Sequence, residues 1–423
     1  MTAIRVWGLL FSCFVLAALV GCSDDDDDAT PKELNGFEPA FIEQWQQVTE
    51  VSEPIPEFVL QPACVPQVVP ANDSVSLRGT IILVHGFTAC NQQYFDWAEQ
   101  LSALGFNVVL PALPGHGLSP DSGELVLESS NLPRNTQSYR DFAEQLVLLG
   151  ELSPGPTKVI AGLSVGGAVA AMAAIEGQDV FDRALIMSPF LAIPETYSPE
   201  TGSPLEPLTE AEEIELLSLL ESGGPGDEEL DALWTFLATK LDQFRVGTAQ
   251  SLLALLKLTN FIPEFDFGWG EPCEAERAAG RAGICNFKVI NLFAVDDFGR
   301  SVLSAYAQAE SLAIDIQLIG VENDTGADPF AIDLLAQQIL VLRGDQGSGF
   351  CLYEEGVVPH SFLSKYDNIT LADEDADDVH LSALERMESL WLARFYFESA
   401  NYLTSAAPEF FTSNEGLCER SAL

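Results

Sequence analysis

The chain has few basic residues and little histidine. Its 423 residues include 19 Lys and Arg against 64 Asp and Glu, which gives a formal net charge of −45. A protein that binds nucleic acid needs a basic surface, and this composition excludes one. The same charge makes an anionic lipid surface a poor electrostatic partner. Hydrophobic residues at 47% and charged residues at 20% exclude a disordered chain and allow a large core.

Motifs for metals and phosphates are also absent. No spacing of Cys and His resembles a zinc site. The pair Gly166-Gly167 is followed by an alanine and no lysine, so it is not a phosphate-binding Walker loop. Residues 373–378 form an acidic run that could suggest a calcium site. A calcium-binding EF-hand loop needs Gly at its sixth position and Glu at its twelfth, and counted from Asp373 these positions hold Asp378 and Leu384. We therefore expect no metal site.

The N-terminus has the pattern of an export signal. Arg5 is the only charge in residues 1–21, and it is followed by the apolar run Val6–Val20. A membrane-spanning helix needs about 20 apolar residues, so this shorter run favours a signal peptide. Leu19–Cys22 resembles the bacterial lipobox, in which the chain is cut before the Cys and that Cys is lipidated. An ordinary secretory signal with an accidental Cys is the alternative.

The lipobox resemblance also implies a location. Lipoproteins with Ser after the modified Cys, here Ser23, usually travel to the outer membrane. We therefore expect a lipid anchor on Cys22 in the bacterial cell envelope, facing either the periplasm or the surface. Residues 22–37, with five consecutive Asp, would form an acidic tether. The sequence leaves the oligomeric state open.

The remaining cysteines fit an oxidising compartment. Of eight Cys, Cys13 would leave with the signal and Cys22 would be lipidated. The other six predict up to three disulfides: Cys64, Cys90, Cys273, Cys285, Cys351 and Cys418. Cys273 and Cys285 are close enough in sequence to close a small loop, and the other pairings stay open.

Strand and helix patterns alternate from Arg78 onward. Gly79–Val84 is a continuous apolar run, which is typical of a strand buried on both faces. Further strands are predicted at Phe106–Leu110, Lys158–Ala161, Ala184–Met187, Ile314–Ile319 and Gly349–Glu354. Helical spacing covers 91–104, about 137–150, the stretch from 164, about 330–340 and about 379–404. This alternation predicts an α/β fold with a mostly parallel sheet covered by helices on both faces.

The alternation stops between residues 191 and 287, where only helical patterns occur. We interpret 191–287 as a helical cap inserted into one α/β core, which comprises 78–190 and 288–405. Residues 38–77 then form an N-terminal segment and 406–423 a C-terminal tail.

Residues 162–166 read Gly-Leu-Ser-Val-Gly, a G-x-S-x-G pentapeptide between a predicted strand and a predicted helix. This context is typical of a nucleophile elbow, in which a sharp turn exposes the Ser hydroxyl. Gly162 and Gly166 would remove side chains that clash in such a turn. We predict Ser164 as the nucleophile; a glycine-rich turn used only for packing is the alternative.

A serine nucleophile needs a base that is oriented by an acid. In chain order these elbows are followed by the acid and then the His, which leaves His360 and His380 of the four histidines. We favour His360, in a loop beyond a predicted strand, over His380, at the start of the last helical pattern. For the acid, Asp324 is favoured over Glu322 and Asp328, and Asp328 before a proline resembles a helix N-cap.

Two backbone N–H groups should bind the negative charge that develops on the substrate oxygen. Val165 N–H follows from the elbow itself, and Phe87 N–H comes from the loop after the strand Gly79–Val84. We interpret His85 as a structural histidine that organises this loop.

Three phrases resemble the α/β-hydrolase superfamily, near bacterial carboxylesterases and monoacylglycerol lipases. They are LVHGFTA at 83–89, LPGHG at 113–117 and GLSVGG at 162–167. The resemblance implies an eight-stranded sheet, a cap, and ester hydrolysis without a cofactor. It also implies attack by Ser164 with Phe87 and Val165 as oxyanion donors. His116 matches a loop histidine outside the triad.

We therefore expect a lipid-anchored serine hydrolase that cleaves a small-molecule or lipid ester through an acyl-enzyme on Ser164. The Leu- and Phe-rich cap suggests an apolar acyl pocket, and a core internal to the cap is an equal alternative. The same triad would also serve an acyltransferase or a peptidase. A non-catalytic envelope lipoprotein that uses the fold for binding is the remaining rival.

Overall fold

The computed structural model describes the core of the chain and parts of its insertion. The described residues are 37–49, 58–120, 131–194, 196–197, 204–205, 209, 211, 214, 218, 256–257, 266–268, 280–322, 324, 326–344, 347–353, 360–361, 363, 370–371, 379–380, 390–405 and 418–421. The predicted signal peptide, the lipidation site Cys22, the tether up to residue 36 and most of the cap 191–287 lie outside these residues.

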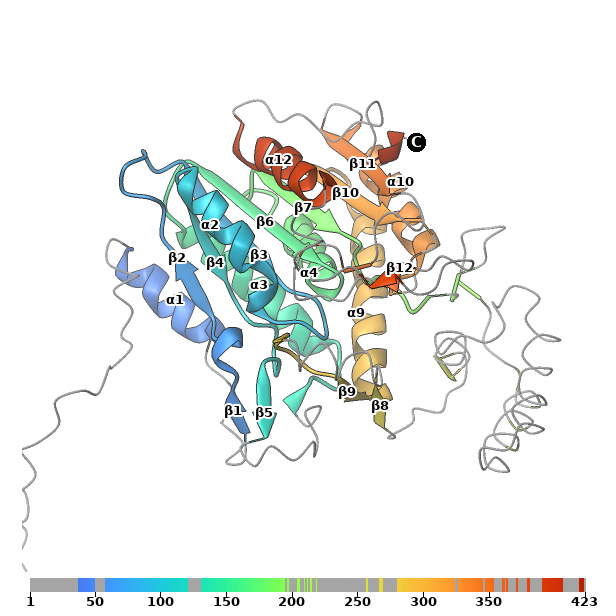
Figure 1. Cartoon of the computed structure of the whole chain (residues 1–423). Helices are drawn as coiled ribbons and strands as arrows, with labels where there is room; N and C mark the ends of the chain where they lie inside the picture. The colour runs from blue at the N-terminus through green and yellow to red at the C-terminus, as the bar shows by residue number, and fades with distance from the viewer. Residues whose placement is uncertain are drawn as a thin grey trace, which may run out of the picture. The chain divides into compact units, whose positions relative to one another are not determined.

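A central sheet of eight strands runs in the order β14-β11-β10-β7-β6-β3-β4-β2 (Figure 1). The six inner strands are parallel, and β2 and β14 pair antiparallel at the two edges. This confirms the α/β fold with a mostly parallel sheet. The strands are β2 (Gln67–Val69), β3 (Gly79–Val84), β4 (Phe106–Leu110), β6 (Thr157–Leu163), β7 (Arg183–Met187), β10 (Asp315–Val321), β11 (Ser348–Tyr353) and β14 (Cys418–Ser421).

Helices cover both faces of this sheet (Figure 1). On one face α2 (Phe95–Ala103) meets α12 (Leu390–Thr404), where the rings of Trp97 and Phe395 are 5.7 Å apart. On the other, α3 (Gln137–Leu152), α4 (Val165–Glu176), α9 (Val289–Gln308) and α10 (Pro329–Arg343) pack in succession. Every residue of β3 and β4 is buried because both faces are covered, which explains why these strands are mostly apolar.

Helix α4 is apolar on all sides. Its residues from Val165 to Ile175 are all buried, and most of them are Ala, Gly or Val. Such a helix belongs to the interior of a protein, and its small side chains let it lie close to the sheet. A Cβ on Gly167 would come within 2.8 Å of the Met187 carbonyl oxygen. This close approach places the beginning of α4 against the ends of the central strands.

Smaller elements surround the core. They are α1 (Pro39–Thr49), the 3₁₀ turns η2 (Pro62–Cys64) and η3 (Asn91–Tyr94), and three two-stranded pairs. The pairs join β1 (Phe58–Leu60) to β5 (Leu118–Pro120), β8 (Asp266–Gly268) to β9 (Asn286–Lys288), and β12 (Thr370–Leu371) to β13 (Val379–His380). The region assigned to the N-terminal segment therefore supplies α1, β1 and the edge strand β2.

The structure corrects the sequence analysis at the C-terminal end. Helix α12 covers Leu390–Thr404, and the helical pattern predicted from 379 is wrong at 379–380. Val379 and His380 instead form β13, in which His380 pairs with Thr370. The eight strands implied by the family resemblance are present among the described residues. One of them, β14, comes from the tail 406–423 that we placed outside the core.

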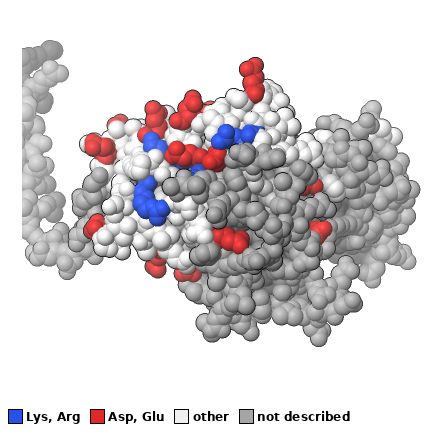
Figure 2. Space-filling view, turned by 90° about the horizontal axis from the view of Figure 1, so that it is seen from above, with Lys and Arg blue, Asp and Glu red and all other residues white. Residues whose placement is uncertain are grey.

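Acidic and basic side chains are mixed on the described surface in Figure 2, where Lys and Arg form small groups beside Asp and Glu. Two arginines that are buried or half-buried donate hydrogen bonds to the carboxyl end of α12. Arg183 donates to the carbonyl oxygens of Tyr402 and Ser405, and Arg78 donates to that of Thr404. No helix within the described ranges is long and apolar enough to span a membrane.

Candidate active site

Ser164 sits at a sharp turn between β6 and α4. Its backbone has φ 58° and ψ −120°, a conformation that non-glycine residues rarely adopt. Its flanking glycines have no room for side chains. A Cβ on Gly162 would collide with the Gly166 carbonyl, and one on Gly166 would collide with the Val84 carbonyl. The pentapeptide therefore forms the strained elbow that its sequence predicts.

Backbone hydrogen bonds hold this turn in place. Ser164 N–H donates to the Met187 carbonyl oxygen at 2.9 Å, and Phe190 N–H donates to the Ser164 carbonyl oxygen at 2.9 Å. The elbow is thus tied to the end of β7 from both sides. Ser164 as a whole is 7% exposed, so it lies just below the surface of the described residues.

An imidazole and a carboxylate meet beyond β10 and β11. His360 Nδ1 lies 2.8 Å from Asp324 Oδ2. The second carboxylate oxygen, Oδ1, accepts from Gly326 N–H at 2.7 Å and from Ala327 N–H at 3.2 Å. Because an ionised carboxylate can only accept, it keeps the imidazole hydrogen on Nδ1 and leaves Nε2 with the lone pair. This tautomer is the one that a general base requires.

The same two groups differ in their access to solvent. The Asp324 side chain is fully buried, whereas 18% of the His360 side chain is exposed. A Cβ on Gly326 would lie 2.5 Å from His360 Cγ, so the ring rests directly on the Gly326 backbone. Gly326 is a site residue that the sequence analysis missed, because nothing in its local sequence shows that a ring 34 residues later will pack on it.

The two other acids considered have different surroundings. Asp328 is the N-cap of α10, and its Oδ1 accepts from Phe330 N–H at 3.0 Å and Ala331 N–H at 3.2 Å. Its Oδ2 accepts from Thr196 and Tyr197 N–H, at the start of the insertion. Asp328 therefore has the capping role indicated by the following proline, and Glu322 directly follows β10.

The parallel strands bring the loops that carry Ser164, Asp324 and His360 to one edge of the sheet. Ser164 follows β6, Asp324 follows β10 and His360 follows β11, and these strands run in the same direction. The loops beyond the carboxyl ends of such strands share one edge of the sheet, which is where open α/β sheets bind their ligands. His380 instead lies in the separate two-stranded pair of β12 and β13.

The loop 85–90 passes beside the nucleophile, since a Cβ on Gly86 would lie 3.5 Å from Ser164 Cβ. His85 fixes this loop. Its Nδ1 hydrogen is donated to the Gly86 carbonyl oxygen at 2.8 Å, and its Nε2 accepts from Leu113 N–H at 3.0 Å. In a trans peptide the carbonyl and the next N–H point in opposite directions. The hydrogen bond to Gly86 therefore also sets the direction of Phe87 N–H.

Both loop histidines are buried and uncharged at neutral pH. Burial, and then the neighbouring His116, lower the pKa of His85 to about 3 despite its bond to Gly86. Burial lowers the pKa of His116 to about 4. The Phe87 ring packs edge-on against His116 at 5.4 Å and against Phe287 at 5.1 Å. These contacts agree with structural roles for both histidines.

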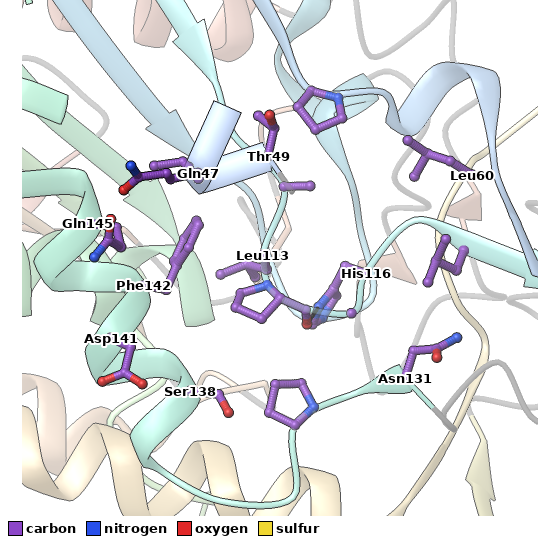
Figure 3. A pocket seen from close by; sticks show the side chains of 17 residues that line it. Gln47, Thr49, Leu60, Leu113, His116, Asn131, Ser138, Asp141, Phe142 and Gln145 are labelled. Carbon is purple, nitrogen blue, oxygen red and sulfur yellow. Dashed lines mark hydrogen bonds between the residues drawn. The ribbon is translucent and has the colours of Figure 1, made fainter. Parts of the chain in front are cut away.

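A cavity of about 390 Å³ lies between α1, α3 and the loop 112–118 (Figure 3). Its wall includes Gln47 and Thr49 from α1, Phe142 and Gln145 from α3, and His116. Neither Ser164, Asp324 nor His360 lines it. The acyl pocket predicted within the cap lies outside the described residues. Within the described part of the chain, no group of three or more His, Cys, Asp or Glu could hold a metal ion.

The structure shows one of the cysteine pairings that the sequence left open. Cys64 and Cys90 are joined, which links the turn η2 to the loop beside the nucleophile. Cys285 and Cys351 each take part in a disulfide as well. The pairing of Cys64 with Cys90 was among the connectivities that the sequence left open.

Comparison with known proteins connects this site to a family. Residues 76–216 match a family model described as serine aminopeptidase, S33. The matched region contains Ser164, Val165 and Phe87, and it ends before Asp324 and His360. No curated protein sequence matches the chain.

Solved structures of lipases and esterases align with this structure at low sequence identity. The monoacylglycerol lipase of Paleococcus ferrophilus is 16% identical, with 80% of this chain and 98% of that chain covered and a TM-score of 0.43. A soluble variant of the Saccharomyces cerevisiae monoglyceride lipase is 13% identical, with coverage of 81% and 92% and a TM-score of 0.47. A carboxyl esterase from Bacillus coagulans is 14% identical, with coverage of 68% and 84% and a TM-score of 0.40.

The sheet order and the elbow define the fold of this protein, and the family match over 76–216 agrees with them. It has an α/β-hydrolase fold, with Ser164, Asp324 and His360 beyond the carboxyl ends of its parallel strands.

Proposed function

We propose that this protein cleaves carboxylic esters, with Ser164 as nucleophile, His360 as base and Asp324 as the acid that orients it. The observation that carries the proposal is the 2.8 Å contact between His360 Nδ1 and a fully buried Asp324 carboxylate. It belongs to a chain whose elbow serine is strained as nucleophile elbows require. Backbone strain and buried ionisable pairs cluster at active sites, so this combination favours an enzyme over a binding protein.

The reaction has two halves. Ser164 Oγ attacks the ester carbonyl carbon while His360 Nε2 takes the hydroxyl proton, and the carbonyl oxygen becomes an anion bound by Phe87 and Val165 N–H. His360 then gives the proton to the leaving alcohol, and the acyl group remains on Ser164. Water attacks this acyl-enzyme with His360 again as base, releasing the acid and free Ser164. Asp324 stabilises the imidazolium formed in each half.

A second candidate is aminopeptidase activity, which the description of the matching family model favours. The net charge of −45 also attracts a substrate with a free ammonium group. The ester proposal is supported by the motif phrases at 83–89 and 113–117, which resemble those of carboxylesterases. Parallel assays with amino-acid nitroanilides and nitrophenyl esters separate the two activities.

The direct test measures hydrolysis of nitrophenyl esters of increasing acyl length by the detergent-solubilised full chain. Ser164→Ala is compared with Ser102→Ala, a matched change at a serine on α2 that bonds to the Pro70 carbonyl oxygen. We expect turnover by the parent and by Ser102→Ala and none by Ser164→Ala. Equal rates in parent and Ser164→Ala would remove Ser164 as the nucleophile. A maximum at long acyl chains would support the predicted apolar pocket.

We also propose that the chain is anchored in the bacterial envelope through a lipid on Cys22. The support is the apolar run that ends at a lipobox-like sequence. Expression with radioactive palmitate should label the parent and leave Cys22→Ala unlabelled. Equal labelling of the two would refute the anchor while leaving the hydrolase proposal intact.

A further inference from the structure

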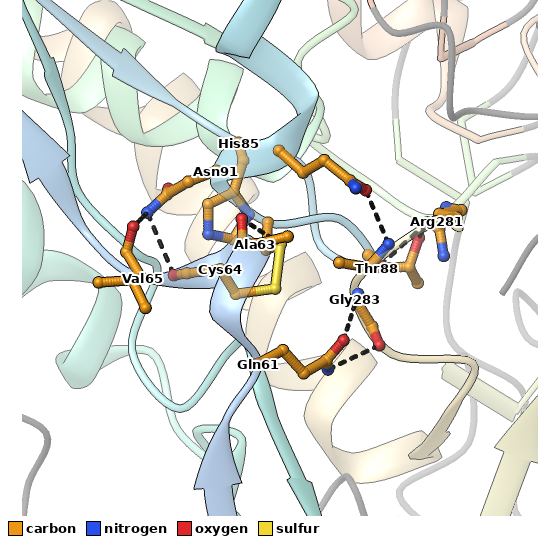
Figure 4. The surroundings of a disulfide bond; sticks show 12 residues. Gln61, Ala63, Cys64, Val65, His85, Thr88, Asn91, Arg281 and Gly283 are labelled. Carbon is orange, nitrogen blue, oxygen red and sulfur yellow. Dashed lines mark hydrogen bonds between the residues drawn. A yellow bond between two sulfur atoms is a disulfide. The ribbon is translucent and has the colours of Figure 1, made fainter. Parts of the chain in front are cut away.

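The segment 280–285 leads from the insertion back to the core, and it docks on the loop beside the nucleophile (Figure 4). Arg281 Nη2 donates to both oxygens of Thr88, at 3.0 Å to the carbonyl and 3.1 Å to Oγ1. The same Thr88 carbonyl accepts from Ile284 N–H at 3.1 Å. Thr88 directly follows Phe87, whose N–H is the proposed oxyanion donor.

Two glutamine side chains hold the segment 280–285 by its backbone. Gln61 donates to the Gly283 carbonyl at 3.1 Å and accepts from Gly283 N–H at 3.2 Å. Gln92 donates to the Gly280 carbonyl at 3.0 Å and accepts from Ala282 N–H at 2.7 Å. Gly283 has φ +130°, and a Cβ there would collide with the Thr88 carbonyl. These paired bonds and the close approach specify one docked position.

The loop is held from its other end by the segment 61–65. Cys90 is disulfide-bonded to Cys64, and Asn91 Nδ2 donates to the carbonyls of Cys64 at 3.2 Å and Val65 at 3.1 Å (Figure 4). Covalent and amide contacts thus fix residues 90–91. At Thr88 the charged group among these contacts is Arg281, and hydrogen bonds from a charged donor are about twice as strong as neutral ones.

We infer that Arg281 is a positioning residue that couples the end of the insertion to the oxyanion-binding peptide. His85 holds the Gly86 carbonyl on one side of Phe87, and Arg281 holds the Thr88 carbonyl on the other. His85 thus fixes the peptide that carries Phe87 N–H, and Arg281 fixes the peptide that follows Thr88, so the short stretch around Phe87 keeps its direction as charge develops on the substrate oxygen. Such donors contribute to catalysis because they need no reorganisation during the reaction. This inference rests on the proposed ester hydrolysis.

The test compares Arg281→Gln and Arg281→Lys with Arg343→Gln, a matched loss of an arginine that pairs with Asp315 at the start of β10. In Arg281→Gln we expect kcat to fall about tenfold, a fraction of the effect of deleting an oxyanion donor. KM should stay within about twofold of the parent value because ground-state binding is untouched. The kcat of Arg281→Lys should lie between those of the parent and Arg281→Gln, and the kcat of Arg343→Gln should match that of the parent.

A second readout separates positioning from general stability. The inhibition constant of an alkyl boronic acid, which forms a tetrahedral adduct on the serine, should rise in Arg281→Gln by the same factor as kcat falls. A fall in kcat without that rise, or unchanged kcat in Arg281→Gln, would overturn the inference. Should Arg281→Gln fail to fold, Thr88→Val removes only the Oγ1 acceptor, and we expect the same two effects at about two- to threefold. Unchanged kcat and inhibition constant in Thr88→Val would then refute the inference.

These outcomes are distinct from failure of the proposed function. If the parent neither hydrolyses esters nor binds the boronic acid, the ester hydrolase proposal fails. If the parent does both and the Arg281 variants do so equally well, only the positioning role fails.

Discussion

The bond between Cys64 and Cys90 should stabilise the folded protein substantially. The two cysteines are 26 residues apart and almost fully buried. In the chain-entropy model, closing a loop of this size removes entropy from the unfolded state worth about 3.5 kcal/mol at 25 °C. We therefore expect Cys64→Ala/Cys90→Ala to lower the free energy of unfolding by about that amount, with a further small loss from the buried sulfur atoms.

Urea unfolding of the double variant, followed by circular dichroism under oxidising conditions, measures this difference. Substitution is preferable to a reducing agent because Cys285 and Cys351 are each in a disulfide too, and a reducing agent would also break those bonds. The kcat for esters should fall as well, since the bond holds the loop that carries Phe87. Unfolding free energies that agree within about 0.5 kcal/mol, the range of a neutral surface change, would refute this reasoning.

Three further substitutions test the site. Asp324→Asn should lower kcat about 10⁴-fold by disturbing the imidazole tautomer, whereas Asp328→Asn should leave steady-state kcat near the parent value. Gly326→Ala should lower kcat because the new Cβ would lie 2.5 Å from His360 Cγ, and circular dichroism should show the fold retained. Burial raises the pKa of Asp328 to about 6 against four backbone N–H donors. Because this pKa lies above its ordinary value, the folded state binds the proton more tightly. The stabilisation, on the order of 3 kcal/mol, is present below about pH 4 and is lost as pH rises through 6. Urea midpoints between pH 4 and 7 should show this slope in the parent and a flatter one in Asp328→Asn.

The sequence predicted the elements whose pattern is local. The buried strands β3, β4, β6, β7, β10 and β11 are mostly apolar because helices cover both faces of the sheet. The elbow at Ser164 was readable because its glycines and its strand-to-helix context are contiguous. Chain order left two candidate bases and three candidate acids, among which we favoured His360 and Asp324, and the structure places these two side chains in contact.

Features that depend on distant contacts could not be predicted. Arg281 and Thr88 are 193 residues apart, and nothing in either local sequence indicates that they bond. Strand β14 is four residues long and rich in polar residues, so its sequence has no pattern typical of a strand. It is a strand because it pairs with β11. At 379–380, pairing with β12 overrides a helical pattern that the sequence alone favours.

The central claim is that Ser164 is an activated nucleophile. Treatment of the full chain with a fluorophosphonate, followed by mass spectrometry of the digested protein, tests it most directly. The account predicts one phosphonyl adduct on the peptide that contains Ser164, and loss of that adduct in His360→Ala because the base is gone. A folded parent that carries no adduct, or one on another residue, would contradict it.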